Sequence, residues 1–422
     1  MSEPLKKPGC QPEGYDPREV PEIVKMAEQA RQGDSYPETI ETEKTTMTEN
    51  YIKHVKPLQQ FMEDGSFLMP EIPALFRAVQ ALGAPEYIDY DYLLSVSGMA
   101  VRLAWQQGWA AYEGLPNQAI FLDGKYGWSV IELAMARVGM KYTIKTVAET
   151  GIEAARRDIK DSIDKGVPVL INEPFVFAAV LGYDESGFYG VSSHADTGKR
   201  LPPHDYNLME DWPNQCISYI LLDEYAPRDM DAALLTDTLR TAVHLARTTR
   251  SECHGDTALG LASFDALAEM MVWDEGFEPL DSNKNAKKNK HYEGELSFPY
   301  ERPEGYYRTD GARTLHDRFW AGYCDFLCML NGYENFARFL DKYADLLPAH
   351  SERLRESAKH YAAANVYSGA LWQYVTPDDK GVAKFKKKEV RYAFAAHMLR
   401  AKIFTVKAVE ILEGILAKED LE

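Results

Sequence analysis

The sequence predicts an α+β domain followed by an all-α domain. Apolar residues recur at helical spacing up to about residue 166, and short apolar, aromatic and β-branched runs separated by turn residues follow. After residue 227 the chain returns to helical periodicity. Helices followed by an antiparallel sheet are typical of the α+β class. We therefore expect a polar arm over residues 1–66, an α+β domain over residues 67–226 and a helical domain over residues 227–422.

The composition is that of a folded, acidic protein. Apolar residues make up 45% of the 422 residues, charged residues make up 27%, and the net charge is -18. This charge argues against nucleic acid or an anionic membrane as a partner. The sequence has no apolar run of transmembrane length and no apolar leader near Met1. We expect a cytoplasmic location, because the cysteines are few and scattered: Cys10, Cys216, Cys253, Cys324 and Cys328.

The first strong helical signal begins at Glu71. Apolar residues from Ala74 to Leu82 repeat at helical spacing, and Gly83 followed by Pro85 ends the element. Further along, a helix is expected over Trp128–Val138, and a second over Ile152–Asp164.

The stretch from Tyr90 to Trp109 is the least regular part of the predicted α+β domain. A short helix from Tyr90 should break at Ser97 and Gly98, because a Ser-Gly pair favours a tight turn. Arg102 and Trp105 are three residues apart, so on a second helical piece they would share one face. The pattern fits a ligand site or a packed connector whose arginine makes a structural salt bridge.

The sheet is expected from four apolar runs. A turn over Asp184–Gly187 predicts a hairpin between the second run and the third. The predicted strands are Val167–Asn172, Phe175–Gly182, Phe188–Ser192 and Ile217–Leu222. The helices expected after them are Asp229–Arg247, Thr257–Val272, Arg313–Leu330, Tyr333–Leu346, His350–Tyr367 and Lys388–Ala417.

Three sequence blocks resemble a known family. They are the SG-x-A-x-R-x-x-W pattern that begins at Ser97, the strand that runs into Leu181-Gly182-Tyr183-Asp184, and Gly260-Leu261-Ala262 at the start of the helical half. In this order they look like the butirosin biosynthesis protein H N-terminal family, which has a papain-like cysteine-protease fold. The resemblance covers Leu68 to about Leu222 and, more loosely, the helices that follow.

The resemblance implies three catalytic positions, and the usual residues are missing from two of them. A papain-like nucleophile would open the first helix, where this chain has Glu71 and no cysteine. The general base would lie six residues before Gly182, at Val176. The orienting group would fall near His194. The resemblance therefore implies a papain-like fold without the thiolate and base that cysteine catalysis needs.

We interpret the other candidate metal-binding and catalytic residues as structural. Cys324 and Cys328 lie four residues apart and are interpreted as core cysteines rather than zinc ligands. The polar segment with His194, Asp196, His204 and Asp205 could bind a metal or act in acid–base chemistry, but we interpret it as a loop that caps the sheet. No standard cofactor or metal motif is present, so we expect no cofactor and no metal.

These observations lead to three functional hypotheses, of which the first two are the main ones. In the first, a non-catalytic cleft binds a small or peptide-like ligand that is acidic and partly apolar. Its ligand-binding residues are Arg102, Trp105, Trp109, Trp128, Glu173 and Asp196. In the second, acyl or amide transfer or hydrolysis uses Glu71, Ser97 and His194 as catalytic residues. The third is a structural, oligomer-forming role, and a homodimer is compatible with all three.

Overall fold

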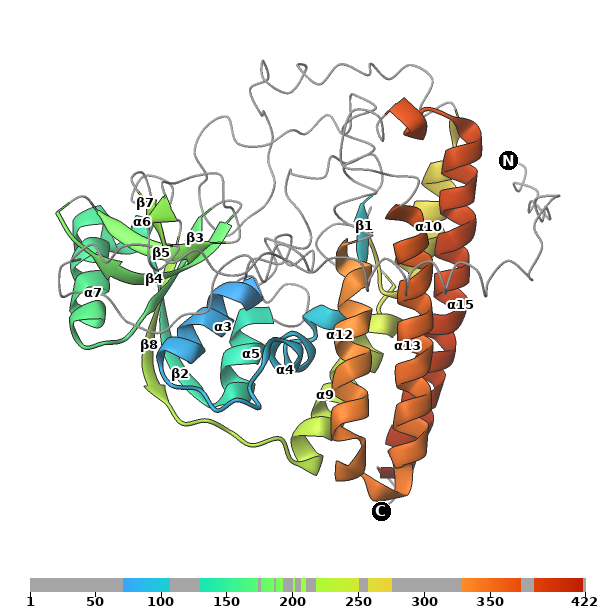
Figure 1. The fold of residues 1–422 in the computed structure, drawn as a ribbon, viewed down its shortest axis with the longest axis horizontal. Coiled ribbons are helices and arrows are strands. Elements are labelled where there is room, and N and C mark those ends of the chain that lie inside the picture. The colour runs from blue at the N-terminus through green and yellow to red at the C-terminus, as the bar shows by residue number, and fades with distance from the viewer. Residues whose placement is uncertain are drawn as a thin grey trace, which may run out of the picture. The chain divides into compact units, whose positions relative to one another are not determined.

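The computed structural model describes residues 71–106, 130–173, 176–185, 187–192, 200–201, 206–209, 218–249, 257–274, 328–372 and 383–419. These residues form an α+β part followed by a helical part, which confirms the predicted fold class (Figure 1). The α+β part contains α3 (Glu71–Ala81), α4 (Tyr90–Val96), η3 (Met99–Val101), β1 (Ala104–Gln106), α5 (Val130–Val138), β2 (Met140–Thr146), α6 (Val147–Thr150), α7 (Ile152–Asp164), β3 (Val169–Glu173), β4 (Val176–Tyr183), β5 (Phe188–Ser192), β6 (Arg200–Leu201), β7 (Tyr206–Met209) and β8 (Ser218–Tyr225). The helical part contains α9 (Ala232–Arg247), β9 (Thr257–Leu259), α10 (Leu261–Val272), α12 (Cys328–Tyr343), η7 (Ala344–Leu346), η8 (Pro348–His350), α13 (Ser351–Trp372) and α15 (Lys388–Glu419).

The main sheet has seven strands in the order β2-β8-β3-β4-β5-β7-β6, and every pair in it is antiparallel. The predicted hairpin between β4 and β5 is present, because the Asp184 amide donates to the Gly187 carbonyl at 2.9 Å. Met140–Thr146 forms strand β2 at the end of the sheet, and this strand was not predicted. Lysines and threonines alternate along this segment, so it lacks the apolar run that identified the inner strands.

Helices cover both faces of the sheet. Leu170 of β3 belongs to the same buried cluster as Leu75 of α3, whereas its neighbour Ile171 joins a second cluster with Ile159 of α7. This alternation follows from the two-residue period of a strand, which sends successive side chains to opposite faces. Figure 1 shows the arrangement, with α7 on one side of the sheet and α3 and α5 on the other.

One apolar core continues from the α+β part into the helical part. The cluster that contains Leu75 and Leu170 also contains Leu93 of α4, Phe336 of α12 and Met398 of α15. The described residues on both sides of the predicted boundary at residue 226 therefore bury their apolar surface against each other. Because buried apolar area is the main source of folding free energy, this shared core couples the two parts energetically.

Two predicted helical segments differ from the structure. Thr257–Leu259 was expected to begin a helix but forms β9, since it pairs antiparallel with β1 and is separated from α10 by Gly260. The break expected before Tyr333 is absent, because α12 runs continuously from Cys328 to Tyr343. The predicted arm over residues 1–66, and the helix expected over Arg313–Leu330 except for its last residues, lie outside the described residues.

Gly260 shows why the chain can turn between β9 and α10. Its φ is +52°, and a β-carbon on it would lie 2.3 Å from the Leu245 carbonyl oxygen and 2.4 Å from the Ala246 carbonyl oxygen. Glycine is therefore required at this position both for its backbone conformation and for space.

We expect Gly260→Ala to lower the free energy of unfolding by more than about 3 kcal/mol, since a backbone clash adds to the cost of a left-handed alanine. Gly166→Ala is the matched control, because Gly166 has φ +77° but open space around its α-carbon. The control should lose only about 1 kcal/mol, which urea unfolding of both variants would measure. Equal losses in the two variants would contradict the close approach at Gly260.

A polar contact also joins the two parts. Asp91 of α4 accepts hydrogen bonds from the Arg338 guanidinium of α12 at 2.7 and 2.8 Å, and from the Asn335 amide at 2.6 Å. The two-point geometry of an arginine–carboxylate pair makes it stronger than most surface ion pairs.

A double-mutant cycle of Asp91→Ala and Arg338→Ala should therefore give a coupling free energy of about 1 kcal/mol in equilibrium unfolding. The control cycle uses Lys141 and Glu224, an ion pair whose two side chains are both mostly exposed. We expect no measurable coupling there. If the coupling free energy between Asp91 and Arg338 is also too small to measure, this contact does not stabilise the two parts against each other.

Candidate functional site

The break predicted at Ser97 and Gly98 is present in the structure. Helix α4 ends at Ser97, and Gly98 has a left-handed backbone with φ +79°. The Ser97 hydroxyl donates to the Leu94 carbonyl at 2.9 Å and accepts from the Met99 amide at 3.2 Å. The Ser97 side chain is 0% exposed, and its hydroxyl stabilises the turn through these hydrogen bonds.

The prediction that Arg102 and Trp105 share a helical face is wrong. The short 3-10 helix η3 ends at Val101, Arg102 is extended, and Trp105 lies in strand β1. Strand β1 pairs with β9, with Trp105 opposite Ala258, and the Leu103 carbonyl accepts from the Gly260 amide at 2.9 Å. The partner strand is more than 150 residues away in the sequence, so local spacing cannot reveal it.

Arg102 and Trp105 are both buried, at 2% and 3% exposure. The Arg102 guanidinium contacts the Met99 sulfur, with a nitrogen–sulfur distance of 3.9 Å. Burial of a guanidinium is costly unless hydrogen bonds and charge compensate it, so the packing around Arg102 must include such compensation. The turn after α4 thus carries a cation and an indole into the interior of the protein.

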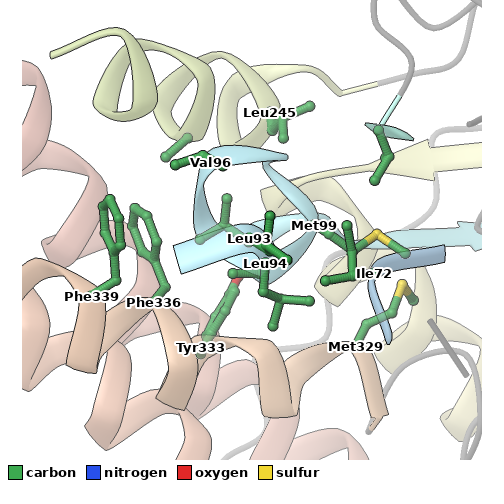
Figure 2. Packing of buried hydrophobic residues seen from close by; sticks show 14 of the residues in the cluster. Ile72, Leu93, Leu94, Val96, Met99, Leu245, Met329, Tyr333, Phe336 and Phe339 are labelled. Carbon is green, nitrogen blue, oxygen red and sulfur yellow. The ribbon is translucent and has the colours of Figure 1, made fainter. Parts of the chain in front are cut away.

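Helix α12 packs directly on this turn. Its Gly332 approaches the Ala100 backbone so closely that a β-carbon on Gly332 would lie 2.5 Å from the Ala100 carbonyl oxygen. Figure 2 shows Leu93, Leu94, Val96 and Met99 facing Met329, Tyr333, Phe336 and Phe339 of α12. We call the residues from Ser97 to Trp105, together with the part of α12 that covers them, the α4–β1 junction.

The first turn of α3 reaches the same junction. The Ile72 side chain lies next to that of Met99 in Figure 2, and both belong to the large buried cluster. Glu71, which opens α3 as predicted, is the residue before Ile72. The structure therefore brings the first turn of α3 against Met99 of the turn after α4, and both regions were predicted to contribute site residues.

The remaining predicted site residues are not brought to this junction by the described parts of the chain. Glu173 ends strand β3 and pairs in register with Val176 of β4, the position where the family resemblance places a general base. Six other predicted site or metal-candidate residues lie outside the described residues: Trp109, Trp128, His194, Asp196, His204 and Asp205. Cys324 also lies outside them, so the interpretation of the Cys324–Cys328 pair stays a prediction.

Arg137 is a residue at this junction that the sequence analysis missed. From the end of α5 it donates to the Val96 carbonyl at 2.7 Å, and to the Asp237 carbonyl and Thr241 hydroxyl of α9 at 3.1 and 2.8 Å. Burial lowers the pKa of Arg137, and the nearby negative charge of the Asp237 carboxylate offsets this in part. Arginine in the last turn of a helix is a common signal, but it does not identify a neighbouring helix as the partner.

A surface depression of about 900 Å³ lies elsewhere, at the start of α7. It is lined by residues of α6 and α7 from Val147 to Arg157, and Gly151 precedes the first turn of α7. Arg156 in its wall lies 3.9 Å from Glu153, and both side chains are largely exposed. None of the predicted site residues lines this depression. We therefore do not treat it as a second site, and we use its residues as controls for the junction.

Neither the family models nor the curated proteins that were searched contain a match to this chain. Within the described ranges, no group of three or more histidine, cysteine, aspartate or glutamate side chains is placed to hold a metal ion. Over the same ranges, no helix combines the length and apolar character needed to span a membrane.

The Gly332–Ala100 contact predicts that a glycine-to-alanine substitution in a helix will lower stability, which is the reverse of its usual effect. Glycine to alanine inside a helix normally stabilises a protein by about 1 kcal/mol, because alanine has the higher helix propensity. We expect Gly332→Ala instead to destabilise by about 2 kcal/mol, since the new methyl group would meet the Ala100 backbone.

Chemical unfolding of Gly332→Ala, with Gly414→Ala beside it, would measure this effect. Gly414 lies in α15, and a methyl group there would meet only the far end of the Arg353 side chain, which can move. The loss at Gly414 should therefore be smaller. A Gly332→Ala variant more stable than the wild type would contradict the packing of α12 on the junction.

Proposed function

We propose that this protein is a papain-like module without the cysteine–histidine pair, and that it binds an acidic, partly apolar small or peptide-like ligand at the α4–β1 junction. The observation that carries the proposal is the burial of Arg102 and Trp105 in the segment whose Met99 lies next to Ile72, in the first turn of α3. In the resemblance, the start of this helix is where a papain-like protein acts on its substrate. The packing of α3 on an antiparallel sheet supports the same comparison.

The chemistry of the junction favours one class of ligand. An arginine recognises carboxylates through a planar pair of donors, and its hydrogen bonds are strong where water is excluded. The Met99 thioether offers apolar, polarisable surface next to that cation, and the Trp105 indole is buried three residues further along the same segment. A molecule with a carboxylate and an aromatic or aliphatic group would match both features.

Acyl or amide transfer is the alternative predicted from the sequence, and it requires more of this structure. A nucleophilic Ser97 would need a base, yet its hydroxyl is buried and bonded to the backbone of its own turn. Ligand binding also requires the junction to open, because Arg102 and Trp105 are buried, but it needs no base, so we propose binding rather than catalysis. The cytoplasmic location belongs to this proposal and rests on the few, scattered cysteines.

Binding of N-acetylphenylalanine, which combines a carboxylate, an amide and a ring, tests the proposal by titration calorimetry. We expect saturable binding by the wild type. Arg102→Lys should weaken it about 10-fold, or roughly 1.4 kcal/mol, because lysine keeps the charge and loses the two-point geometry. Arg156→Met is the control, since Arg156 lines the separate depression at α7, and it should bind as the wild type does.

Thermal melts of each variant would establish that the fold is intact, and Trp105→Phe provides a second variant that keeps an aromatic ring in the core. No saturable binding by the wild type would contradict the proposal. Equal affinity of wild type, Arg102→Lys and Trp105→Phe would also contradict it, because the ligand would then bind elsewhere.

A further inference from the structure

The last residue of α4 is held from outside the helix. The final carbonyl groups of any α-helix have no partner within it, so they need other donors. In α4 the Leu94 carbonyl accepts from the Ser97 hydroxyl, which belongs to the turn itself. The Val96 carbonyl accepts instead from the Arg137 guanidinium of α5, at 2.7 Å. Arg137 therefore fixes the point at which the chain leaves α4 and enters the α4–β1 junction.

Helix α9 determines where the Arg137 guanidinium lies. The nitrogen of Arg137 that does not contact Val96 donates to the Asp237 carbonyl at 3.1 Å and to the Thr241 hydroxyl at 2.8 Å. The Thr241 hydroxyl donates its own proton to the Asp237 carbonyl at 2.9 Å, so its oxygen is free to accept from Arg137. Figure 2 shows Val96 beside α9, the helix that carries Leu245.

The contacts continue from Val96 to Arg102. Ser97 follows Val96 directly, and its hydroxyl accepts from the Met99 amide at 3.2 Å. The Arg102 amide donates to the Met99 carbonyl at 3.4 Å, and the Arg102 guanidinium lies 3.9 Å from the Met99 sulfur. A continuous series of polar contacts thus leads from α9, through Arg137 and the turn, to the cation of the junction.

We infer that Arg137 is a positioning residue through which α9 sets the ligand affinity of the α4–β1 junction. Arg137 holds Val96, and the turn that follows then presents Arg102 in the orientation that two-point binding of a carboxylate requires. The inference rests on the proposed ligand site, and it assigns the control of that site to α9. An arginine that only braced the fold would contribute to stability and leave the affinity of the folded protein unchanged.

Titration calorimetry with N-acetylphenylalanine, at a temperature where every variant is folded, tests the inference. Arg137→Lys should weaken binding about 10-fold, because lysine keeps the charge but lacks the planar group that spans α4 and α9. Thr241→Val, a nearly isosteric change remote from the ligand, should weaken it in the same direction. Arg240→Met is the matched control, since Arg240 lies on α9 and contacts only the Asp237 side chain at the surface among the acceptors of Arg137. It should bind as the wild type does.

The double variant Arg137→Lys with Arg102→Lys separates positioning from bracing. Lysine at position 102 does not depend on two-point geometry, so Arg137→Lys should then cost less than about 2-fold in affinity. Losses that multiply in the double variant would overturn the inference, because Arg137 would then act independently of Arg102.

Hydrogen exchange of the Met99 amide tests the first step without ligand. We expect faster exchange of this amide in Arg137→Lys, with unchanged exchange in the inner strand β3. Unchanged exchange at Met99 would overturn the inference whether or not the ligand binds.

The outcomes distinguish this inference from the proposed function. A wild type that does not bind N-acetylphenylalanine would overturn the ligand site and the control assigned to it. If the wild type binds, Arg102→Lys binds weakly, and both Arg137→Lys and Thr241→Val bind as the wild type does, the ligand site stands and the role of Arg137 is overturned.

Discussion

The close packing of α12 on the turn after α4 is the contact on which the rest of the structure depends. Gly332 leaves no room for a side chain against the Ala100 backbone, and the aromatic residues of α12 cover Leu93 and Val96. Since this contact joins the α+β part to the helical part, it extends one apolar core through both. The same contact covers the turn that carries Arg102 and Trp105 inward. The candidate site is therefore a consequence of how the two parts fit together.

This arrangement explains the features of the junction that are unusual for a short connector. Ser97 and Gly98 end α4 sharply, and Arg137 holds the last helical carbonyl before that turn. β9, which belongs to the helical part, then pairs with β1 and draws the chain into an extended form. A ligand site built in this way would be rigid, because backbone bonds to two distant elements fix it.

Much of the fold could be predicted from the sequence, because local patterns determine it. Turn residues delimit the hairpin at Asp184–Gly187, and helical periodicity is strong in α7 and α9. The sequence did not reveal β2, whose edge position permits polar residues, or β9, which only its partner β1 makes a strand. Arg102 and Trp105 were predicted as candidate site residues, but on a helix rather than in an extended segment. Arg137 was not predicted, because its hydrogen-bond acceptors lie 41 to 104 residues away in the sequence. Contacts of this kind depend on tertiary packing and leave no local signal.

Calorimetric unfolding of the full chain tests the shared core most directly. If the core couples the α+β part and the helical part, both should unfold in one transition, and the calorimetric enthalpy should equal the van't Hoff enthalpy. Hydrogen exchange measured alongside should give similar opening free energies for the inner strands β3 and β4 and for helix α12. Two separate transitions, with the sheet and α12 losing protection independently, would contradict a single core and would restore the boundary expected at residue 226.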